Sequence, residues 1–306
     1  MRIVFCISLL ALLAGTAAQA ESVPAEFPKA VLVTGASTGI GRKITERLAA
    51  DGYFVYAGAR SDSDLAELNA IENVQALRLD VTKPEEIAAA VEAVTAAGRG
   101  LHGLVNNAGV AITGPFSDTT EEDFDFVMQV NVYGPYRVTK AFTPLIVAGK
   151  GRITTISSIS GILSARDLGV YSMSKHAIEA FADSLALQME PQGVRVSIVE
   201  PGNYNSEIGK SAARRSGVSR LTDRSVYKSP DEVAEAVKLA LFEPEPKRRY
   251  MVVPNAYEAE ITIRKAIQEL AELNEGHAHT YGRDALVQML DEALATARPA
   301  VPAAPL

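Results

Sequence analysis

The stretch AVLVTGASTGIG, residues 30–41, joins a short apolar run to a glycine-rich turn and the start of a helical pattern. The apolar run is continuous, which suits a strand buried on both faces of a sheet. Gly35, Gly39 and Gly41 allow positive φ and close approach of the backbone. The helix that follows begins with free N–H groups and the positive end of its dipole. The stretch therefore predicts a strand, a turn that can hold an anion such as a phosphate, and a helix.

From this stretch onward, short apolar runs alternate with longer amphipathic segments. We expect strands at residues 30–34, 53–59, 74–79, 101–106, 152–157, 194–199 and 250–253. We expect helices around Tyr171 and at residues 40–50, 84–97, 121–147 (interrupted near Pro135 and Pro144), 230–241, 261–273 and 284–295. Alternation of this kind predicts an α/β fold with a single doubly wound parallel sheet, helices on both of its faces, and a C-terminal helical extension.

The domain boundaries follow from where this alternation begins and ends. One core domain is expected over residues 29–255, followed by a helical extension at 256–297 and a disordered, proline-containing tail at 298–306. Within the core domain, residues 203–228 are polar, with basic residues scattered over 210–224. A connection of this length in a compact domain is usually a functional lid or a disordered segment.

Residues 1–20 have the features of a secretory signal peptide. Arg2 supplies a positive start, residues 3–14 are apolar, and Ala18-Gln19-Ala20 fits a small-x-small cleavage site that leaves Glu21 as the first mature residue. The apolar run is shorter than the roughly 20 residues that span a bilayer, so we favour cleavage over a retained membrane anchor. Cleavage predicts an exported or periplasmic protein. Retention, or a true start further along, predicts a membrane-anchored or cytoplasmic one.

The amino-acid composition indicates which kinds of partner, cofactor and metal chemistry to expect. The 306 residues are 47% hydrophobic, which allows a large core. The formal net charge is −7 and no large basic cluster is present, which argues against a nucleic-acid partner. The only cysteine, Cys6, lies in the signal segment, so the cleaved chain is expected to use no thiol chemistry. His277 and His279 have no further ligands nearby, so no metal site is expected.

A second informative stretch is YSMSK, residues 171–175. On a helix, Tyr171 and Lys175 stand at positions i and i+4 and project side by side. A phenol keeps its proton until about pH 10, and a neighbouring positive charge lowers that pKa, which makes the phenol a usable acid or base nearer neutrality. A half-buried tyrosine beside a solvated lysine is the ordinary alternative, so the pair gains weight from the rest of the chain.

Seven short motifs in sequence order carry a resemblance to a known family. They are TGASTGIG at 34–41, Asp80-Val81, Asn106-Asn107-Ala108-Gly109, Asn131, Ser157-Ser158, Tyr171-x-x-x-Lys175 and Pro201-Gly202. With these motifs, the chain resembles the short-chain dehydrogenase/reductase family from Lys29 to Val253. The resemblance implies a Rossmann-like fold and a nicotinamide-dependent oxidoreductase. A local run, Val-Tyr-Ala before Arg60, is similar to that of hydroxysteroid and retinol dehydrogenases.

The resemblance also implies a catalytic tetrad. Tyr171 would be the general acid for ketone reduction or the base for alcohol oxidation, and Lys175 would lower its pKa and bind the nicotinamide ribose. Ser158, which stands 13 positions before Tyr171, would bind the substrate oxygen. Asn131 would hold a water that extends the proton relay from Lys175. Fixed donors of this kind stabilise the charge that develops on oxygen during hydride transfer.

The implied cofactor site follows the ends of the strands. Ser206 stands where the family usually has a threonine that contacts the nicotinamide carboxamide, and it keeps the hydroxyl. Open α/β sheets bind ligands at this edge. The expected cofactor-binding residues are Gly35, Ser37, Gly39, Ile40, Gly41, Arg60, Asp80, Val81, Asn107, Ala108, Gly109, Tyr171, Lys175, Pro201, Gly202 and Ser206.

The end of the second strand indicates which nicotinamide cofactor is used. NAD-preferring folds place an acid there for the ribose 2′-hydroxyl, whereas an arginine accommodates a 2′-phosphate. Here Ala59 stands at the acid's position and Arg60 follows, so we expect NADP(H) rather than NAD(H), with Ser37 as a possible helper. Alternatively, Arg60 is a solvated residue or pairs with Asp62 or Asp64.

The expected substrate is a small carbonyl or alcohol. The wall of the active site is expected from residues 110–116, 159–168 and 203–228. Within them, the side chains of Ile112, Phe116, Ile162 and Leu163 are apolar, which suits a lipophilic ketone or alcohol. The arginines of the 203–228 segment suggest, as a second choice, an anionic group. A non-catalytic NADP-binding scaffold of the same fold is the rival class, although all four tetrad residues are present. The resemblance further implies a homodimer or homotetramer formed through the helices that carry Asn131 and Tyr171.

Overall fold

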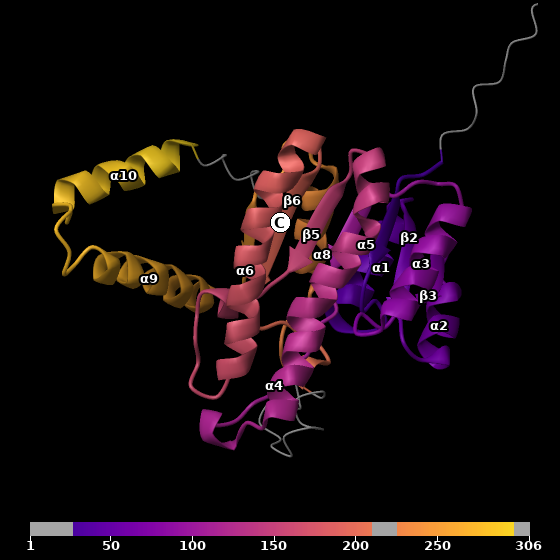
Figure 1. Cartoon of the computed structure of the whole chain (residues 1–306), viewed down its shortest axis with the longest axis horizontal. Helices are drawn as coiled ribbons and strands as arrows, with labels where there is room; N and C mark the ends of the chain where they lie inside the picture. Colours follow the sequence, from indigo (N-terminus) through magenta and orange to yellow (C-terminus); the bar gives the residue numbers. More distant parts are fainter. Residues whose placement is uncertain (1–26, 210–224, 297–306) are drawn as a thin grey trace, which may run out of the picture.

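The computed structural model describes residues 27–209 and 225–296, which form a seven-stranded parallel sheet in the order β3-β2-β1-β4-β5-β6-β7 (Figure 1). The proposed signal peptide, residues 210–224 of the expected lid and the tail at 298–306 lie outside the described residues. The strands are β1 Ala30–Val33, β2 Phe54–Ala59, β3 Val74–Arg78, β4 Gly103–Asn106, β5 Arg152–Ile156, β6 Arg195–Pro201 and β7 Arg249–Val252.

Helices cover both faces of the sheet, because every strand alternates its side chains between two cores. In β1, Ala30 and Leu32 pack into one core and Val31 and Val33 into the other. The first core also takes side chains of α3 Pro84–Ala96, α4 Glu121–Met128, α5 Gly134–Ala148 and α6 Gly169–Met189. The second core takes side chains of α1 Gly39–Ala50, α2 Asp62–Asn69 and α8 Asp231–Phe242. The predicted doubly wound α/β fold is confirmed.

Two local features differ from the sequence prediction. The helix α2 was not predicted, because only Leu68 of its eight residues is buried and its apolar periodicity is therefore weak. Ser61 begins it by accepting a hydrogen bond from the N–H of Asp64. The long helix expected at 121–147 is divided by a π-helical turn, η2 Gln129–Tyr133. Pro135 begins α5 directly after this turn, whereas Pro144 lies inside α5 without ending it.

The C-terminal extension consists of α9 Ala256–Leu273 and α10 Arg283–Thr296, which lead away from the sheet (Figure 1). Asn255 caps α9, and Glu258 in its first turn is buried against the loop after β6. Most apolar side chains of the two helices are exposed. Across residues 27–209 and 225–296, no helix is both long and apolar enough to cross a membrane.

Candidate active site

A cavity of about 570 Å³ opens at the carboxyl ends of the parallel strands. The strand order reverses between β1 and β4, and the crevice outside such a reversal is where open α/β sheets bind ligands. The cavity is lined by the turn after β1 and by the segments after β2, β3, β4, β5 and β6. All of the predicted site residues except Asn131 line it.

The glycine turn after β1 forms one end of the cavity. Neighbouring atoms lie so close to Gly35 and Gly41 that a larger residue would not fit at either position. Gly35 has a φ of +63°, and a Cβ atom there would lie 2.9 Å from Ala108 Cα. A Cβ atom at Gly41 would overlap the carbonyl oxygen of Gly35 and the side-chain amide of Asn107. Thr38 stands before α1, and its side chain makes no hydrogen bond to the first turn of the helix. The helix end is therefore packed closely on the turn and faces the cavity with its own N–H groups.

The Asn106–Gly109 segment is held against the turn by hydrogen bonds. The hydroxyl of Thr34 accepts from the backbone N–H groups of Asn107 at 3.0 Å and Ala108 at 3.1 Å. The Asn107 side chain donates to the carbonyl oxygens of Thr34 and Gly35. Asn106 donates to the Thr139 hydroxyl at 2.9 Å, so both asparagines brace the end of the sheet and the pocket.

Tyr171 and Lys175 lie side by side on α6 at the floor of the cavity. The ammonium nitrogen of Lys175 is 5.6 Å from the centre of the Tyr171 ring and donates to the carbonyl oxygen of Ile156 at 2.9 Å. Lys175 is only 5% exposed, and burial lowers its pKa from 10.5 to about 8, an effect that Glu179 opposes. The ammonium therefore begins to lose its proton only on the alkaline side of neutrality.

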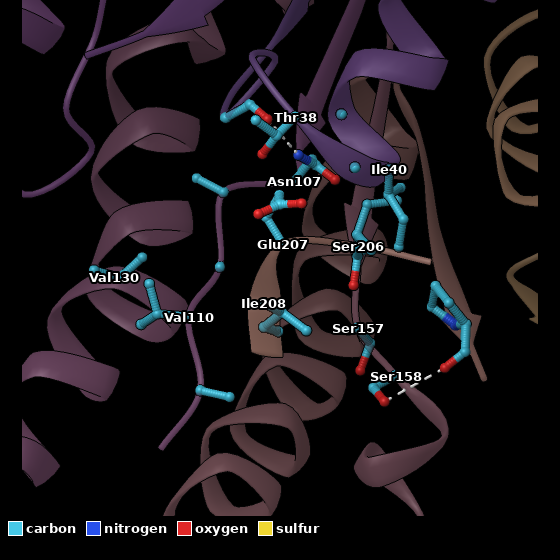
Figure 2. A pocket seen from close by; sticks show the side chains of 18 of the residues that line it. Thr38, Ile40, Asn107, Val110, Val130, Ser157, Ser158, Ser206, Glu207 and Ile208 are labelled. Carbon is cyan, nitrogen blue, oxygen red and sulfur yellow. Dashed lines mark hydrogen bonds between the residues drawn. The ribbon is translucent and has the colours of Figure 1, made fainter. Parts of the chain in front are cut away.

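Ser158 also lines the cavity, at the start of the 3₁₀ turn η3 Ile159–Gly161. Its hydroxyl accepts from the N–H of Ser160 at 3.1 Å and donates to the carbonyl oxygen of Pro201 at 3.4 Å, a long contact (Figure 2). The 3.4 Å distance leaves this hydroxyl available to a shorter hydrogen bond.

Asn131 lies in the π-helical turn η2, and its side chain is buried away from the cavity. Its side-chain oxygen accepts from the N–H of Val110 at 2.9 Å, and its amide donates to the carbonyl oxygen of Val110 and to Ser174. These bonds fix the cavity segment after β4 to α6. The side chain of Asn131 is thus hydrogen-bonded to Val110 and Ser174, and its role in a water relay stays a prediction.

Arg60 lies on the rim of the cavity, next to the end of β2. Asp62 pairs with Arg78, not with Arg60, so the alternative that Asp62 neutralises Arg60 is wrong. Arg78 also donates to the carbonyl oxygen of Arg60. Asp64 lines the same rim, and its N–H is used to cap α2. Among the described residues, no carboxylate forms an ion pair with the Arg60 guanidinium, so an anion can approach it.

The apolar wall differs from the one predicted from the sequence. Ile112 packs into the core and Phe116 is 76% exposed, while Ile162 and Leu163 are half-buried and do not line the cavity. The three segments predicted to form the wall do contribute to it, but through other side chains than those named. The side chains that pack beside Tyr171 are Ala111, Leu168 and Ile208.

The loop after β6 supplies Glu207 and Ile208, which were not among the site residues predicted from the sequence. Figure 2 shows both facing the cavity together with Ser206, which was predicted to line it. Tyr204 donates to Glu232 at 2.6 Å, which ties this loop to α8. The break in periodicity after Pro201-Gly202 indicated a loop, but it held no signal for the side chains that turn inward.

Comparison with known proteins gives the family. A model described as short chain dehydrogenase matches residues 29–216. The chain belongs to the short-chain dehydrogenase family. The predicted resemblance to this family is confirmed, and the relatives include retinol dehydrogenase 5 of Mus musculus, which is 40% identical over 193 residues (61% of this chain and 60% of that protein).

Two other relatives align with this chain over different fractions of their own length. Mitochondrial D-beta-hydroxybutyrate dehydrogenase of Bos taurus is 38% identical over 200 residues, covering 62% of this chain and 58% of that protein. The chain thus matches less than two thirds of that relative's length. The uncharacterized oxidoreductase YbbO of Escherichia coli (strain K12) is 32% identical over 235 residues, covering 73% of this chain and 85% of that protein.

Solved structures of short-chain dehydrogenases share the fold. A short-chain dehydrogenase from Streptomyces avermitilis has a TM-score of 0.71 and 32% identity, covering 82% of this chain and 96% of that one. A short chain dehydrogenase from Burkholderia cenocepacia, solved in complex with NADP, has a TM-score of 0.67 and 25% identity, covering 80% of this chain and 95% of that one.

Proposed function

We propose that the chain is an NADP(H)-dependent oxidoreductase that transfers a hydride between the nicotinamide and a ketone or secondary alcohol. The observation that carries this proposal is the arrangement of one cavity. Ser158, Tyr171 and Lys175 line it together with the glycine turn at 34–41. A phosphate-binding turn and an acid–base pair in one cavity suit a reaction in which a dinucleotide and a small substrate meet.

The residues present fit a nicotinamide dinucleotide. The close contacts at Gly35 and Gly41 show a turn packed tightly against Asn107 and Ala108, and both glycines line the cavity with bare backbone. The N-terminus of α1 points its N–H groups there, where a pyrophosphate would bind. Ser206 would contact the nicotinamide end and Lys175 its ribose. When bound there, the cofactor supplies or accepts the hydride.

The chain's own residues would handle the proton and the charge on oxygen. The Tyr171 phenol gives its proton to the substrate oxygen in reduction and takes it back in oxidation. The ammonium of Lys175 favours the phenolate, and Ser158 donates a hydrogen bond to the same substrate oxygen. Asn131 holds the Val110 segment against α6 and so keeps the wall and floor of the cavity in place.

NADP(H) is favoured over NAD(H) by Arg60. Ala59 leaves no carboxylate at the end of β2, and Arg60 lies on the cavity rim without an ion pair among the described residues. A planar guanidinium matches the charge and geometry of a 2′-phosphate. Two of the solved relatives support this choice by their descriptions: the Burkholderia cenocepacia protein with NADP, and an alcohol dehydrogenase of Thermococcus sibiricus complexed with 5-hydroxy-NADP (TM-score 0.64, 29% identity, 73% of this chain and 95% of that one).

A lipophilic substrate is favoured by the surroundings of Tyr171. Ala111, Leu168 and Ile208 pack beside its ring, and Ile159 lines the same cavity. Burial of an apolar substrate against such a wall is stabilised by about 25 cal/mol per Å² of apolar surface. The names of the relatives indicate two different classes of substrate, since one is a retinol dehydrogenase and another a D-beta-hydroxybutyrate dehydrogenase. We infer that lipophilic ketones or alcohols are preferred to short hydroxy acids.

The first experiment is a parallel fluorescence titration of the purified chain with NADPH and NADH. Arg60→Ala should weaken NADPH binding by about tenfold to a hundredfold, the value of a hydrogen-bonded charge contact, and leave NADH binding unchanged. Arg264→Ala on the exposed face of α9 is the matched control. Equal affinity for both cofactors in the unchanged chain would remove the preference for NADP(H).

Turnover separates an enzyme from a binding scaffold. With NADPH and a series of lipophilic ketones, Tyr171→Phe should lower kcat by about 10²–10⁴-fold, because the acid is lost, and should leave NADPH affinity nearly unchanged. A short 3-hydroxy acid with NADP tests the rival substrate class. Comparable activity in the Tyr171→Phe chain is the result that would refute the proposed mechanism.

A further inference from the structure

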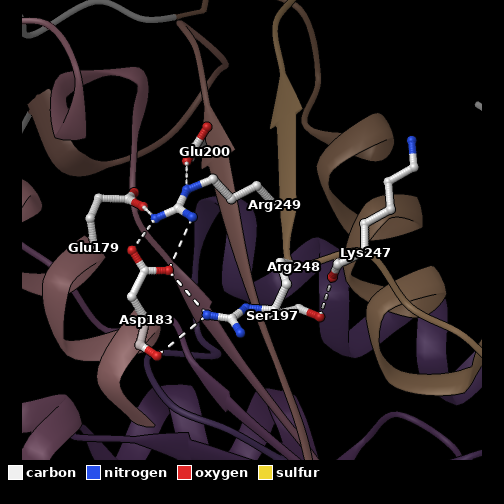
Figure 3. A network of polar contacts seen from close by, with 7 residues as sticks. All are labelled: Glu179, Asp183, Ser197, Glu200, Lys247, Arg248 and Arg249. Atoms are coloured by element: carbon white, nitrogen blue, oxygen red, sulfur yellow. Dashed lines mark hydrogen bonds and ion pairs between the residues drawn. The ribbon is translucent and has the colours of Figure 1, made fainter. Parts of the chain in front are cut away.

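A cluster of charged side chains, shown in Figure 3, lies outside the cavity and includes residues of α6 that follow Lys175. The guanidinium of Arg249, on β7, is at its centre. It lies 3.1 Å from Glu179 and 2.8 Å from Asp183, both on α6, and 3.2 Å from Glu200 on β6. Arg248 reaches Asp183 from the other side at 3.1 Å. Three carboxylates of two elements thus share two guanidinium groups.

The cluster continues the catalytic face of α6. Tyr171, Lys175, Glu179 and Asp183 follow one another at intervals of four residues, so their side chains form one row along the helix. The row runs from the cavity, where Tyr171 and Lys175 lie, to the partly exposed Asp183. Glu179 is therefore the group next to Lys175 on the side away from the substrate.

Glu179 also lies against the turn that carries Ser158. A Cβ atom at Gly161 would be 2.9 Å from both the Glu179 carboxylate and the Ser157 hydroxyl. Glu179 is 9% exposed, and α6 packs along the whole of η3. The carboxylate is thus buried between Arg249 and the turn that carries Ser158, one helical turn after Lys175.

We propose that Glu179 is a positioning residue: its carboxylate, fixed by Arg249, keeps Lys175 in the charged form and supports the turn that carries Ser158. This inference rests on the proposed function for its catalytic meaning. A carboxylate one helical turn from a buried ammonium offsets part of the stabilisation that the ammonium loses by leaving water. Without it, the charge of Lys175 would depend on the hydrogen bond to the carbonyl oxygen of Ile156 and on the Tyr171 ring.

The two other carboxyl groups of the cluster, Glu200 and Asp183, have pKa values shifted in opposite directions. Burial, and secondly the charge of Glu179, raise the pKa of Glu200 to about 7, while Arg249 lowers it. Glu200 is thus the carboxyl group that holds a proton near neutrality. Arg249 lowers the pKa of Asp183, so Asp183 stays ionised, and it lies one turn further from Lys175. The remaining charged groups that face this cluster are Arg248 and Lys175 itself.

The test measures the charge of Lys175 directly in the full chain without added cofactor. The ¹³Cε signal of Lys175 in ¹³C-lysine-labelled protein, assigned by its loss in Lys175→Arg, is followed against pH. In the unchanged chain its midpoint is expected near 8. Because Glu179 raises the pKa of Lys175, Glu179→Gln should lower the midpoint by about one pH unit, whereas Glu179→Asp should restore most of it.

Two matched variants distinguish this role from general damage to the cluster. Glu200→Gln removes an equally buried carboxyl group and Asp183→Asn a nearby ionised one, and neither should lower the Lys175 midpoint. If Glu179→Gln does not fold, Glu179→Met, which replaces the charge by an apolar side chain of similar length, takes its place. A midpoint that stays the same in the Glu179 variants overturns the proposal.

The pH dependence of kcat distinguishes a failure of this inference from a failure of the proposed function. With NADPH and a turned-over ketone, Glu179→Gln should move the alkaline limb of the kcat profile to lower pH by the same amount as the Lys175 midpoint. A shifted midpoint in a chain without turnover would support the electrostatic role and refute the proposed function. Turnover combined with an unshifted Lys175 midpoint would support the proposed function and refute the electrostatic role of Glu179.

Discussion

At the scale of single residues, Gly41 shows how closely the cofactor cradle is built. It carries no positive φ, so its requirement is purely steric: a Cβ atom would overlap the carbonyl oxygen of Gly35 and the amide of Asn107. Gly41→Ala must therefore move the turn or the Asn107 segment. We expect a loss of about 1–3 kcal/mol in the free energy of unfolding, typical of overpacking, and weaker NADPH binding.

Denaturant unfolding and an NADPH titration check this prediction. Gly282→Ala is the matched control, because a Cβ atom there meets nothing within 4 Å and its φ is not positive. If Gly41→Ala binds NADPH as well as the unchanged chain does, then the turn is not the tight cradle described above.

At the scale of elements, α9 is attached to the active-site loop through Glu258. This carboxylate accepts from the N–H of Asn203 at 2.8 Å and lies against Gly202, while Asn255 both caps the helix and donates to Glu258. The loop from Pro201 to Ile208 lines the cavity. The helical extension is thus connected to the site by one buried carboxylate.

Removal of the Glu258 carboxylate should destabilise both α9 and the loop after β6. Glu258→Ala removes the carboxylate that accepts from the half-buried N–H of Asn203, which costs about 1–3 kcal/mol in the free energy of unfolding. We also expect weaker NADPH binding, since the loop loses its support. Glu260→Ala, on the same helix and paired with Arg264 at the surface, is the control. Thermal unfolding and the NADPH titration measure both effects, and equal behaviour of the two variants would contradict the link.

At the scale of the whole molecule, the cavity joins segments from both halves of the sheet. The turn after β1 and the segments after β2 and β3 come from one half, and those after β4, β5 and β6 from the other. A ligand that bridges these segments binds only the folded chain and raises its stability by mass action.

NADPH at about 100 times its Kd should therefore stabilise the fold by about 2.7 kcal/mol, seen as a rise in Tm. NADH at the same concentration should raise Tm less, and Arg60→Ala should bring the NADPH effect down to that of NADH. A scan with inorganic pyrophosphate controls for simple anion binding. An equal rise with both cofactors would argue against Arg60 as the phosphate-binding group.

Much of this protein was determined by short-range patterns in its sequence. The strand–turn–helix at 30–41, the Tyr171–Lys175 spacing and the order of the motifs predicted the sheet and most of the cavity, because strand burial and helical periodicity are local properties. Where the local pattern was weak, as in α2, the prediction failed. The oligomeric state and the role of the N-terminal segment stay predictions from the sequence.

Only the tertiary structure decided which distant side chains meet. In the folded chain, Ala111, Leu168 and Ile208 pack beside Tyr171, whereas Ile112 packs into the core of the sheet. The tertiary structure paired Asp62 with Arg78 and left Arg60 on the cavity rim. It also brought Arg249 from the last strand to Glu179 behind the catalytic lysine. These contacts join residues far apart in sequence, so no local periodicity encodes them, and they depend on how the helices and strands pack.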